Sequence, residues 1–228
     1  MIKNNEILNN LQKVKKEIKN ACALAKVSEN SINLVAVSKT IDTIYICEAA
    51  RLGQTSFGEN KVQEAMLKWP EIKTRFPKTV LHMIGPLQSN KVKDAIKIFD
   101  VIETVDREKI VLELKKNINK VKNFPDLYVQ VNIGEEKQKH GCAPSEAKNF
   151  ITNCKDYGLN IKGVMAIPPN GENPVPYFAL LANIAKESNI NNISMGMSKD
   201  FEKAIYLGAT SVRIGTKIFG ERTDEKFK

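Results

Sequence analysis

The residue with the clearest chemical potential is a lysine near the end of a short apolar run. Lys39 follows the apolar segment 34–37 (LVAV), from which it is separated by Ser38. Four apolar residues between polar ones predict a buried strand, whose end would carry the amine of Lys39 beyond the sheet. Burial lowers the pKa of a lysine amine, and a neutral amine attacks carbonyl groups. Lys39 is therefore a candidate for forming a Schiff base, and the alternative is a solvated lysine that turns outward.

Two glycine-containing segments late in the sequence have the character of phosphate-binding loops. They are 194–198 (SMGMS) and 213–216 (RIGT). Glycine lets a phosphate approach the backbone closely, and N–H groups at a helix N-terminus bind it. We expect Ser198 to be the N-cap of the helix that follows and to offer its hydroxyl, while Gly215 and Thr216 offer amides. Taken singly, each glycine is explained equally well by an ordinary turn.

A carbonyl-reactive lysine and a phosphate-binding edge together favour pyridoxal 5′-phosphate as the cofactor. Its aldehyde would bond to Lys39, and its phosphate would lie near Ser198, Gly215 and Thr216. Arg213 would then fall near the ring nitrogen. A guanidinium is a permanent donor, so it would keep that nitrogen unprotonated and weaken the ring as an electron sink. The alternative for Arg213 is a surface ion pair at a strand end.

Hydrophobic periodicity predicts the elements that would bring these residues together. Apolar residues at steps of three and four predict an amphipathic helix within residues 1–28. Eight strand-like runs then alternate with helical patterns, at 33–37, 55–57, 80–84, 101–103, 127–133, 161–165, 192–194 and 211–214. Strict alternation predicts a parallel sheet, and eight units in about 200 residues predict a closed (β/α)8 TIM barrel. We expect the barrel at 33–220, within a single α/β domain over 1–228, with an open doubly wound sheet as the alternative.

This fold would gather the candidate residues at one edge, because parallel α/β folds bind ligands at the carboxyl ends of their strands. The first strand leads to Lys39, the second is followed by Asn60, and the third carries His82. The last two strands run into the segments 194–198 and 213–216. In barrels of this kind, a phosphate often lies on the loops after strands seven and eight.

Composition argues against several other classes of protein. The chain has 228 residues, a net charge of +9, four cysteines and two histidines. No apolar stretch is long enough to span a bilayer, and the start lacks a secretory pattern. Scattered cysteines fit reduced thiols in a cytoplasmic protein and argue against a structural zinc site. Lysines are spread along the chain without a dense block, so we expect a solvated surface, with no nucleic-acid or membrane partner.

Several motifs, taken in order along almost the whole sequence, have a clear resemblance. They are VSKT at 37–40, FGEN at 57–60, HMIGPLQSNK at 82–91, SMGMS at 194–198 with Asp200, and VRIG at 212–215 with IFG at 218–220. This series resembles the pyridoxal phosphate homeostasis proteins (the YggS/PROSC family), which are relatives of the alanine racemase N-terminal barrel.

The resemblance implies a fold-type III barrel that holds pyridoxal phosphate on Lys39, in a cytosolic protein that buffers the cofactor and delivers it to apo-enzymes that require it. It implies no firm enzymatic activity. The site residues that it implies, besides Lys39, are Ser198, Gly215 and Thr216 for the phosphate, Arg213 for the ring nitrogen, and Asn60 and His82 as pocket walls. The sequence has His140 where relatives often carry a small or polar residue; we assign it no role and expect it to be exposed.

Two functions from different classes remain open: a non-catalytic cofactor carrier and a racemase-like enzyme acting on amino acids. Racemisation needs an acid or base on each face of the substrate carbanion. Racemases of this fold take the second one from a β-rich domain, typically a tyrosine that reaches across a dimer. The sequence ends at Lys228, soon after the eighth strand, so we expect that domain to be absent. The missing base and the weakened electron sink favour the carrier, as a monomer or weak dimer.

Overall fold

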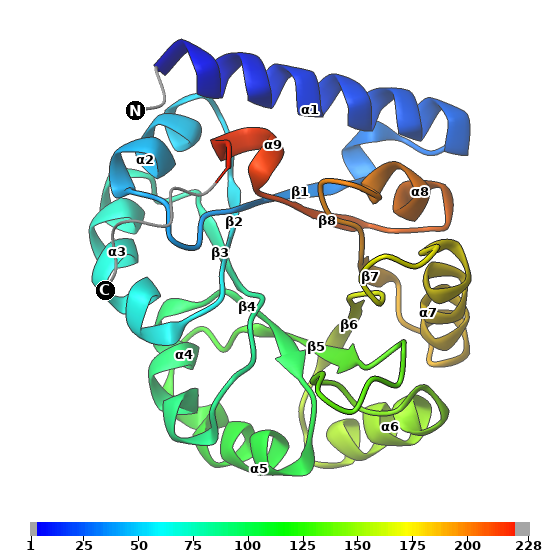
Figure 1. Ribbon diagram of the computed structural model, residues 1–228. Helices are drawn as coiled ribbons and strands as arrows, with labels where there is room; N and C mark the ends of the chain where they lie inside the picture. The colour runs from blue at the N-terminus through cyan, green and yellow to red at the C-terminus, as the bar shows by residue number, and fades with distance from the viewer. Residues whose placement is uncertain (1–3, 222–228) are drawn as a thin grey trace.

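Eight parallel strands close into a barrel in the computed structural model, which describes residues 4–221. Each strand is hydrogen-bonded to the next, and β8 pairs with β1 (Figure 1). The expectation of a closed (β/α)8 barrel is therefore confirmed, and the open sheet is wrong. The strands are β1 Asn33–Val37, β2 Ser56–Glu59, β3 Val80–Met83, β4 Val101–Val105, β5 Asp126–Val131, β6 Ile161–Ala166, β7 Asn192–Ser194 and β8 Ser211–Ile214.

Helices surround the barrel, as Figure 1 shows. The first, α1, lies along the outside and contacts α2, α8 and α9. Four short 3₁₀ turns are η1 Glu29–Ser31, η2 Ser89–Lys91, η3 Ile118–Lys120 and η4 Pro144–Glu146. The α-helices are α1 Asn4–Ala25, α2 Thr43–Arg51, α3 Val62–Arg75, α4 Val92–Ile98, α5 Glu108–Asn117, α6 Ala147–Asp156, α7 Val175–Glu187, α8 Phe201–Tyr206 and α9 Thr216–Phe219.

The apolar stripe of α1 is buried, as its periodicity predicts. Ile7, Leu11 and Val14 are at most 2% exposed. Polar contacts add to this apolar face, because the Asn10 side-chain amide donates to the Ile218 carbonyl at 3.0 Å and Glu17 pairs with Lys217 at 2.6 Å. The predicted segment 1–28 thus contains a helix over Asn4–Ala25, and residues 1–3 lie outside the described part of the chain.

Two strands extend two residues further at their carboxyl ends than expected, and each contains a buried glutamate. The second strand continues through Glu59, and the fourth continues past Glu103 to Val105. Charged side chains are rarely buried, so a glutamate in an apolar run is read as its end. Both glutamates are 0% exposed: Glu103 faces His82 and Arg213 inside the barrel, and the side chain of Glu59 lies between β2 and α3, where it contacts Lys68 and Trp69.

Candidate cofactor-binding site

The residues proposed from the sequence lie at the carboxyl ends of the strands. Lys39 is two residues past β1 and is half-buried, whereas a solvated lysine would be fully exposed. Asn60 follows β2 directly, and His82 lies within β3. The remaining four come from the β7 and β8 end of the barrel: Ser198, Arg213, Gly215 and Thr216.

Loops after three strands meet beside Lys39. A Cβ added to Gly215 would lie 3.3 Å from the Val37 Cβ, so the loop after β8 rests on the last residue of β1. The Thr216 hydroxyl lies 3.0 Å from the Ser198 hydroxyl, which joins the loop after β8 to the loop after β7. Only glycine fits at position 196, where φ is +91° and an added Cβ would lie 2.6 Å from the Ala204 Cβ. Ser198, Gly215 and Thr216 therefore lie together at the carboxyl end of the barrel, and we term this group the rim.

The expectation that Ser198 caps the following helix is wrong. The N-cap of α8 is Asp200, two residues later. A turn precedes the helix, in which the Asp200 carboxylate accepts from the Met197 amide at 2.6 Å. Aspartate serves as an N-cap as well as serine does, so the sequence alone did not separate the two positions. As a result, the Ser198 hydroxyl is engaged with Thr216 at the rim.

Arg213 is 3% exposed, so the alternative of a surface ion pair is wrong. Its Nη1 donates to the Ser194 hydroxyl, and its Nη2 donates to the Ala166 carbonyl at 2.9 Å. Neither of these hydrogen bonds involves Nε. The Nη1 atom also lies 3.6 Å from Oε2 of Glu103. The guanidinium is thus fixed inside the barrel by groups from β4, β6 and β7.

Four residues inside the barrel, His82, Glu103, Ser194 and Arg213, form what we term the Glu103 cluster. Nδ1 of His82 lies 2.7 Å from Oε1 of Glu103, and the Ser194 hydroxyl donates to Oε2 at 2.6 Å. Burial alone would raise the pKa of Glu103. The hydrogen bond and charge of His82 and the charge of Arg213 outweigh it, so the pKa lies below the ordinary value. The charge of Glu103 is therefore compensated, and the cluster crosses the barrel from His82 in β3 to Arg213 in β8.

A second group, Ser38, Glu59, Lys68 and Trp69, lies next to Lys39, and we term it the Glu59 cluster. Oε1 of Glu59 accepts from the Ser38 hydroxyl at 2.8 Å and from the Trp69 indole at 3.2 Å, and it lies 2.9 Å from Nζ of Lys68. The Trp69 ring packs on Phe57, with ring centroids 5.2 Å apart. Burial raises the pKa of Glu59, and the Lys68 ammonium offsets only part of this rise.

Two of the residues proposed from the sequence carry a buried polar atom that has no hydrogen-bond partner within residues 4–221. These atoms are Oδ1 of Asn60 and Nε2 of His82. Nδ1 of His82 is engaged with the Glu103 carboxylate, which leaves Nε2 on the other side of the ring without a partner. Buried polar atoms are nearly always hydrogen-bonded in folded proteins. These two atoms are therefore open to a bound group or to ordered water.

The sequence reasoning missed Glu59, Lys68, Glu103 and Ser194 as functional positions. A signal was present for Glu103, which interrupts the apolar run 101–105 (VIETV) without ending the strand. No such signal marked Lys68, because it is one of two lysines on α3 and its carbonyl partners are far away in the sequence. His140 is exposed, as predicted, and its Nδ1 lies 3.4 Å from Oδ2 of Asp106.

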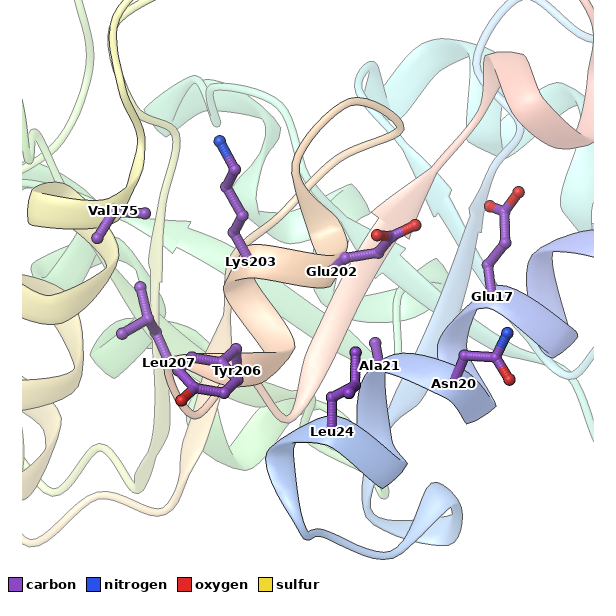
Figure 2. Close-up of a pocket in the computed structure, with 9 residues that line it drawn as sticks. All are labelled: Glu17, Asn20, Ala21, Leu24, Val175, Glu202, Lys203, Tyr206 and Leu207. Atoms are coloured by element: carbon purple, nitrogen blue, oxygen red, sulfur yellow. The ribbon is translucent and has the colours of Figure 1, made fainter.

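A groove on the outer surface is separate from this site. Figure 2 shows it between α1 and α8, where Leu24, Tyr206 and Leu207 line it beside Glu17 and Lys203. None of its lining residues belongs to the rim or to either cluster. We therefore do not place the cofactor site there.

Solved structures similar to this chain show the class of its fold. An alanine racemase from Clostridium difficile 630 matches 98% of this chain and 59% of its own, with a TM-score of 0.71 and 16% identity, a likeness that shows the fold. PipY of Synechococcus elongatus PCC7942, solved with pyridoxal phosphate bound, matches 90% of this chain and 100% of its own, with a TM-score of 0.76 and 32% identity. The chain therefore has the alanine racemase-like (β/α)8 barrel.

Sequence comparison narrows this class to one family. No family model matches the sequence. The pyridoxal phosphate homeostasis protein of Haemophilus influenzae is 35% identical over 227 residues, which cover 95% of this chain and 96% of that protein. Its counterpart in Escherichia coli K12 is 37% identical over 235 residues, which cover 97% and 99%. The chain belongs to the pyridoxal phosphate homeostasis protein family, and the resemblance predicted from the motifs is confirmed.

Proposed function

We propose that this protein binds pyridoxal 5′-phosphate through a Schiff base on Lys39 and serves to buffer and deliver the cofactor in the cell. Family membership supports this function, as does the solved structure of PipY with pyridoxal phosphate bound. The observation that carries the assignment of Lys39 is the contact of Gly215 with Val37, because it brings a glycine and hydroxyl rim beside the candidate lysine.

The residues present fit this cofactor in kind and in place. When bound, pyridoxal phosphate supplies an aldehyde and a ring that can accept electrons. The hydroxyls of Ser198 and Thr216 and the amides of Gly215 and Thr216 would hold its phosphate. Asn60 and His82 would form the walls, since each offers a buried polar atom without a hydrogen-bond partner within residues 4–221.

Arg213 would direct its Nε–H toward the ring nitrogen, because its two observed hydrogen bonds use Nη1 and Nη2. An arginine side chain donates hydrogen bonds, accepts none, and does not release its proton in proteins. It would therefore leave the ring nitrogen unprotonated, which weakens the ring as an electron sink. This assignment favours storage of the cofactor over its use in catalysis.

An amino-acid racemase is the second candidate, favoured by the likeness of the barrel to alanine racemases. That reaction needs a second acid or base opposite Lys39. Tyr157 and Tyr177, on the outer surface, are hydrogen-bonded to Glu108 and Glu172. The other tyrosines lie in the outer helices α2 and α8 and in β5. Tyr128 of β5 lies near Glu103, and burial together with the charge of Glu103 raises its pKa. It is therefore poorly suited to act as the second base, which supports the carrier.

We further propose that apo-enzymes that require pyridoxal phosphate receive it from this protein, which acts in the cytoplasm as one domain over 1–228 and as a monomer or weak dimer. The four cysteines are free, which is compatible with a reducing compartment. Within residues 4–221, none of the helices is both long and apolar enough to cross a membrane.

Absorption spectroscopy with borohydride trapping tests this proposal. The purified protein is mixed with pyridoxal phosphate, reduced, digested and analysed by mass spectrometry. We expect a visible band and a pyridoxyl group on Lys39. Lys39→Ala should lose the band, while Lys186→Ala, a change on the distant helix α7, should keep it. A protein that stays colourless, or a label scattered over many lysines, would contradict the proposal.

The two candidate functions are separated by turnover on the loaded protein. The racemisation of L-alanine is followed by polarimetry, with free pyridoxal phosphate as the reference. We expect a rate equal to this reference for the carrier. A clear rate that disappears in Lys39→Ala would establish the racemase instead.

A further inference from the structure

The backbone just before Lys39 is held on three sides. The Ser38 amide donates to the Gly58 carbonyl at 2.9 Å, and the Ser38 hydroxyl donates to Glu59 at 2.8 Å. The Ser38 carbonyl, which belongs to the peptide bond joining it to Lys39, accepts from Nζ of Lys68 at 3.0 Å. Ser38 is 0% exposed, so these bonds are shielded from water.

The backbone just after Lys39 adopts an uncommon conformation that other groups stabilise. Thr40 has a φ of +62°, in the left-handed region that β-branched residues strongly avoid. Its amide donates to Oε1 of Glu64 at 2.7 Å, and the carbonyl of Ile41 accepts from Nζ of Lys68 at 3.3 Å. Such a conformation persists only where surrounding contacts enforce it, and it occurs frequently at functional sites.

The ammonium group of Lys68 contacts the backbone on both sides of Lys39. Nζ of Lys68 lies 2.9 Å from Oε1 of Glu59 and 2.7 Å from Oε1 of Glu64, in addition to its contacts with the carbonyls of Ser38 and Ile41. The Lys68 side chain is 13% exposed, and that of Glu59 is 0% exposed. An ammonium has three donors, and here four oxygen atoms from both sides of Lys39 share them.

We infer that Glu59, Glu64 and Lys68 form a clamp that positions Lys39 for the cofactor. The inference rests on the proposed function, because it concerns how the amine meets an aldehyde. A lysine side chain has many rotamers, and a reacting group must be held near its target for bond formation to be fast. The clamp fixes the peptide groups on both sides of Lys39 and so fixes the direction of its Cα–Cβ bond. Lys68 acts through the backbone and is a positioning residue.

A second lysine on the same helix provides a matched control. Nζ of Lys73 donates to the Ile98 carbonyl at 2.8 Å and to Oδ2 of Asp100 at 2.7 Å. It therefore makes the same kinds of contact as Lys68, a backbone carbonyl and a carboxylate, but on the segment that leads into β4. Its side chain is 26% exposed. Lys73→Met should resemble Lys68→Met in its general cost to α3 and leave the Lys39 backbone intact.

Hydrogen exchange tests the clamp on the protein without cofactor. Wild type, Lys68→Met and Lys73→Met are compared by mass spectrometry of peptides that span residues 38–42. We expect the Thr40 amide to exchange at least about tenfold faster in Lys68→Met, because local opening then costs less free energy. Lys73→Met should match wild type in these peptides. Equal exchange in all three proteins, or equal acceleration in both variants, would overturn the clamp.

Cofactor uptake tests whether the clamp matters for Lys39. The rise of the visible band is followed at several concentrations of pyridoxal phosphate. We expect uptake by Lys68→Met to be slower by about tenfold or more, the scale of a misplaced reacting group, with Lys73→Met close to wild type. Wild-type uptake rates in Lys68→Met would overturn the inference. If the wild type itself takes up no cofactor, the proposed function fails, and hydrogen exchange alone decides the clamp.

Glu64→Gln provides a milder variant in case Lys68→Met does not fold. Glu64 lies at the edge of the clamp, with a side chain that is 20% exposed, and glutamine keeps an oxygen that can accept from Thr40. It removes the charge that pairs with Lys68. We expect faster exchange at Thr40 and slower uptake, both by less than in Lys68→Met. Exchange and uptake rates identical to those of wild type would count against Glu64 as a member of the clamp.

Discussion

The Glu59 and Glu103 clusters are built from the same parts but treat their carboxylates differently. Each glutamate is 0% exposed, and each is approached by a serine hydroxyl, a ring nitrogen and a cationic side chain. The pKa of Glu59 is raised because burial dominates, whereas His82 and Arg213 outweigh burial and lower the pKa of Glu103. The same kinds of donor group therefore accompany opposite shifts in the pKa of the two glutamates.

The difference lies in how the donors are distributed over the two oxygens. In the Glu59 cluster, Ser38, Trp69 and Lys68 all approach Oε1, and Oε2 has no partner among the described residues. In the Glu103 cluster, His82 binds Oε1, while Ser194 binds Oε2 and Arg213 lies near it. Burial of a carboxylate is compensated only when both oxygens are satisfied. The Glu103 cluster is thus the more fixed of the two.

The largest effect is expected from removing the Glu103 carboxylate. Glu103→Leu would leave the Arg213 guanidinium buried without its charge partner, which costs about 3–5 kcal/mol in the free energy of unfolding. Urea denaturation followed by circular dichroism measures this loss. Glu187→Leu, at an exposed position at the end of α7, should change stability by less than about 0.5 kcal/mol. A loss of the same small size in Glu103→Leu would show that Glu103 does not compensate the buried charge of Arg213.

A smaller loss is expected from removing the cation of the Glu59 cluster. In Lys68→Met, Glu59 keeps its bonds from Ser38 and Trp69, and its raised pKa makes protonation easier than at Glu103. We expect the free energy of unfolding to fall by about 1–3 kcal/mol, the range for hydrogen bonds to charged groups. The same denaturation experiment ranks Lys68→Met and Glu103→Leu by their loss of stability. A loss in Lys68→Met larger than that in Glu103→Leu would reverse the comparison between the clusters.

Opposite pKa shifts predict opposite pH dependences. The contribution of Glu103 to stability is fully present above the ordinary glutamate pKa of about 4.3, and it is lost as pH falls toward the lowered folded-state pKa. The folded state binds a proton at Glu59 more readily than the unfolded state does. Stability contributed by Glu59 therefore grows as pH falls through its raised pKa toward about 4.3.

Glutamine variants measure how the contribution of each glutamate to stability changes with pH. The free energy of unfolding of wild type minus that of Glu59→Gln should rise on acidification from pH 7 to about 4.3. The rise is about 1.4 kcal/mol for each pH unit by which the pKa of Glu59 is raised. The difference between wild type and Glu103→Gln should stay level over this range and decline below it. Two difference curves with slopes of the same sign would refute the assigned shifts.

The smallest effect on stability is expected at the rim, outside both clusters. Thr216→Ala removes one exposed hydroxyl bond to Ser198 and should cost less than about 1 kcal/mol in the free energy of unfolding. It should still weaken cofactor binding, because the hydroxyl is a proposed phosphate contact. Equilibrium titration with pyridoxal phosphate measures the affinity. Unchanged affinity in Thr216→Ala would remove Thr216 from the proposed site and leave both clusters untouched.

The sequence was sufficient for the barrel, because eight alternating apolar runs leave few other arrangements. It was also sufficient to place Lys39, Ser198 and Gly215 at one edge, since parallel strands all end on the same side. It did not reveal that Lys68 binds the carbonyls of Ser38 and Ile41, because such a contact depends on how α3 packs on β2 next to the segment that follows β1. Nor did it separate Ser198 from Asp200 as the cap of α8. Long-range side-chain pairing, such as that of Glu103 with Arg213, has no local pattern to indicate it.

The position of Trp69 gives this protein an internal optical reporter. It is the single tryptophan of the chain, is 0% exposed, and donates its indole N–H to Glu59 beside the Lys39 backbone. Indole fluorescence therefore originates from one point, next to the carboxylate on which the clamp is built. Loading, release and loosening of this region should each change the emission of Trp69, so that the exchange of the cofactor with a recipient enzyme that lacks tryptophan can be followed in real time without a label.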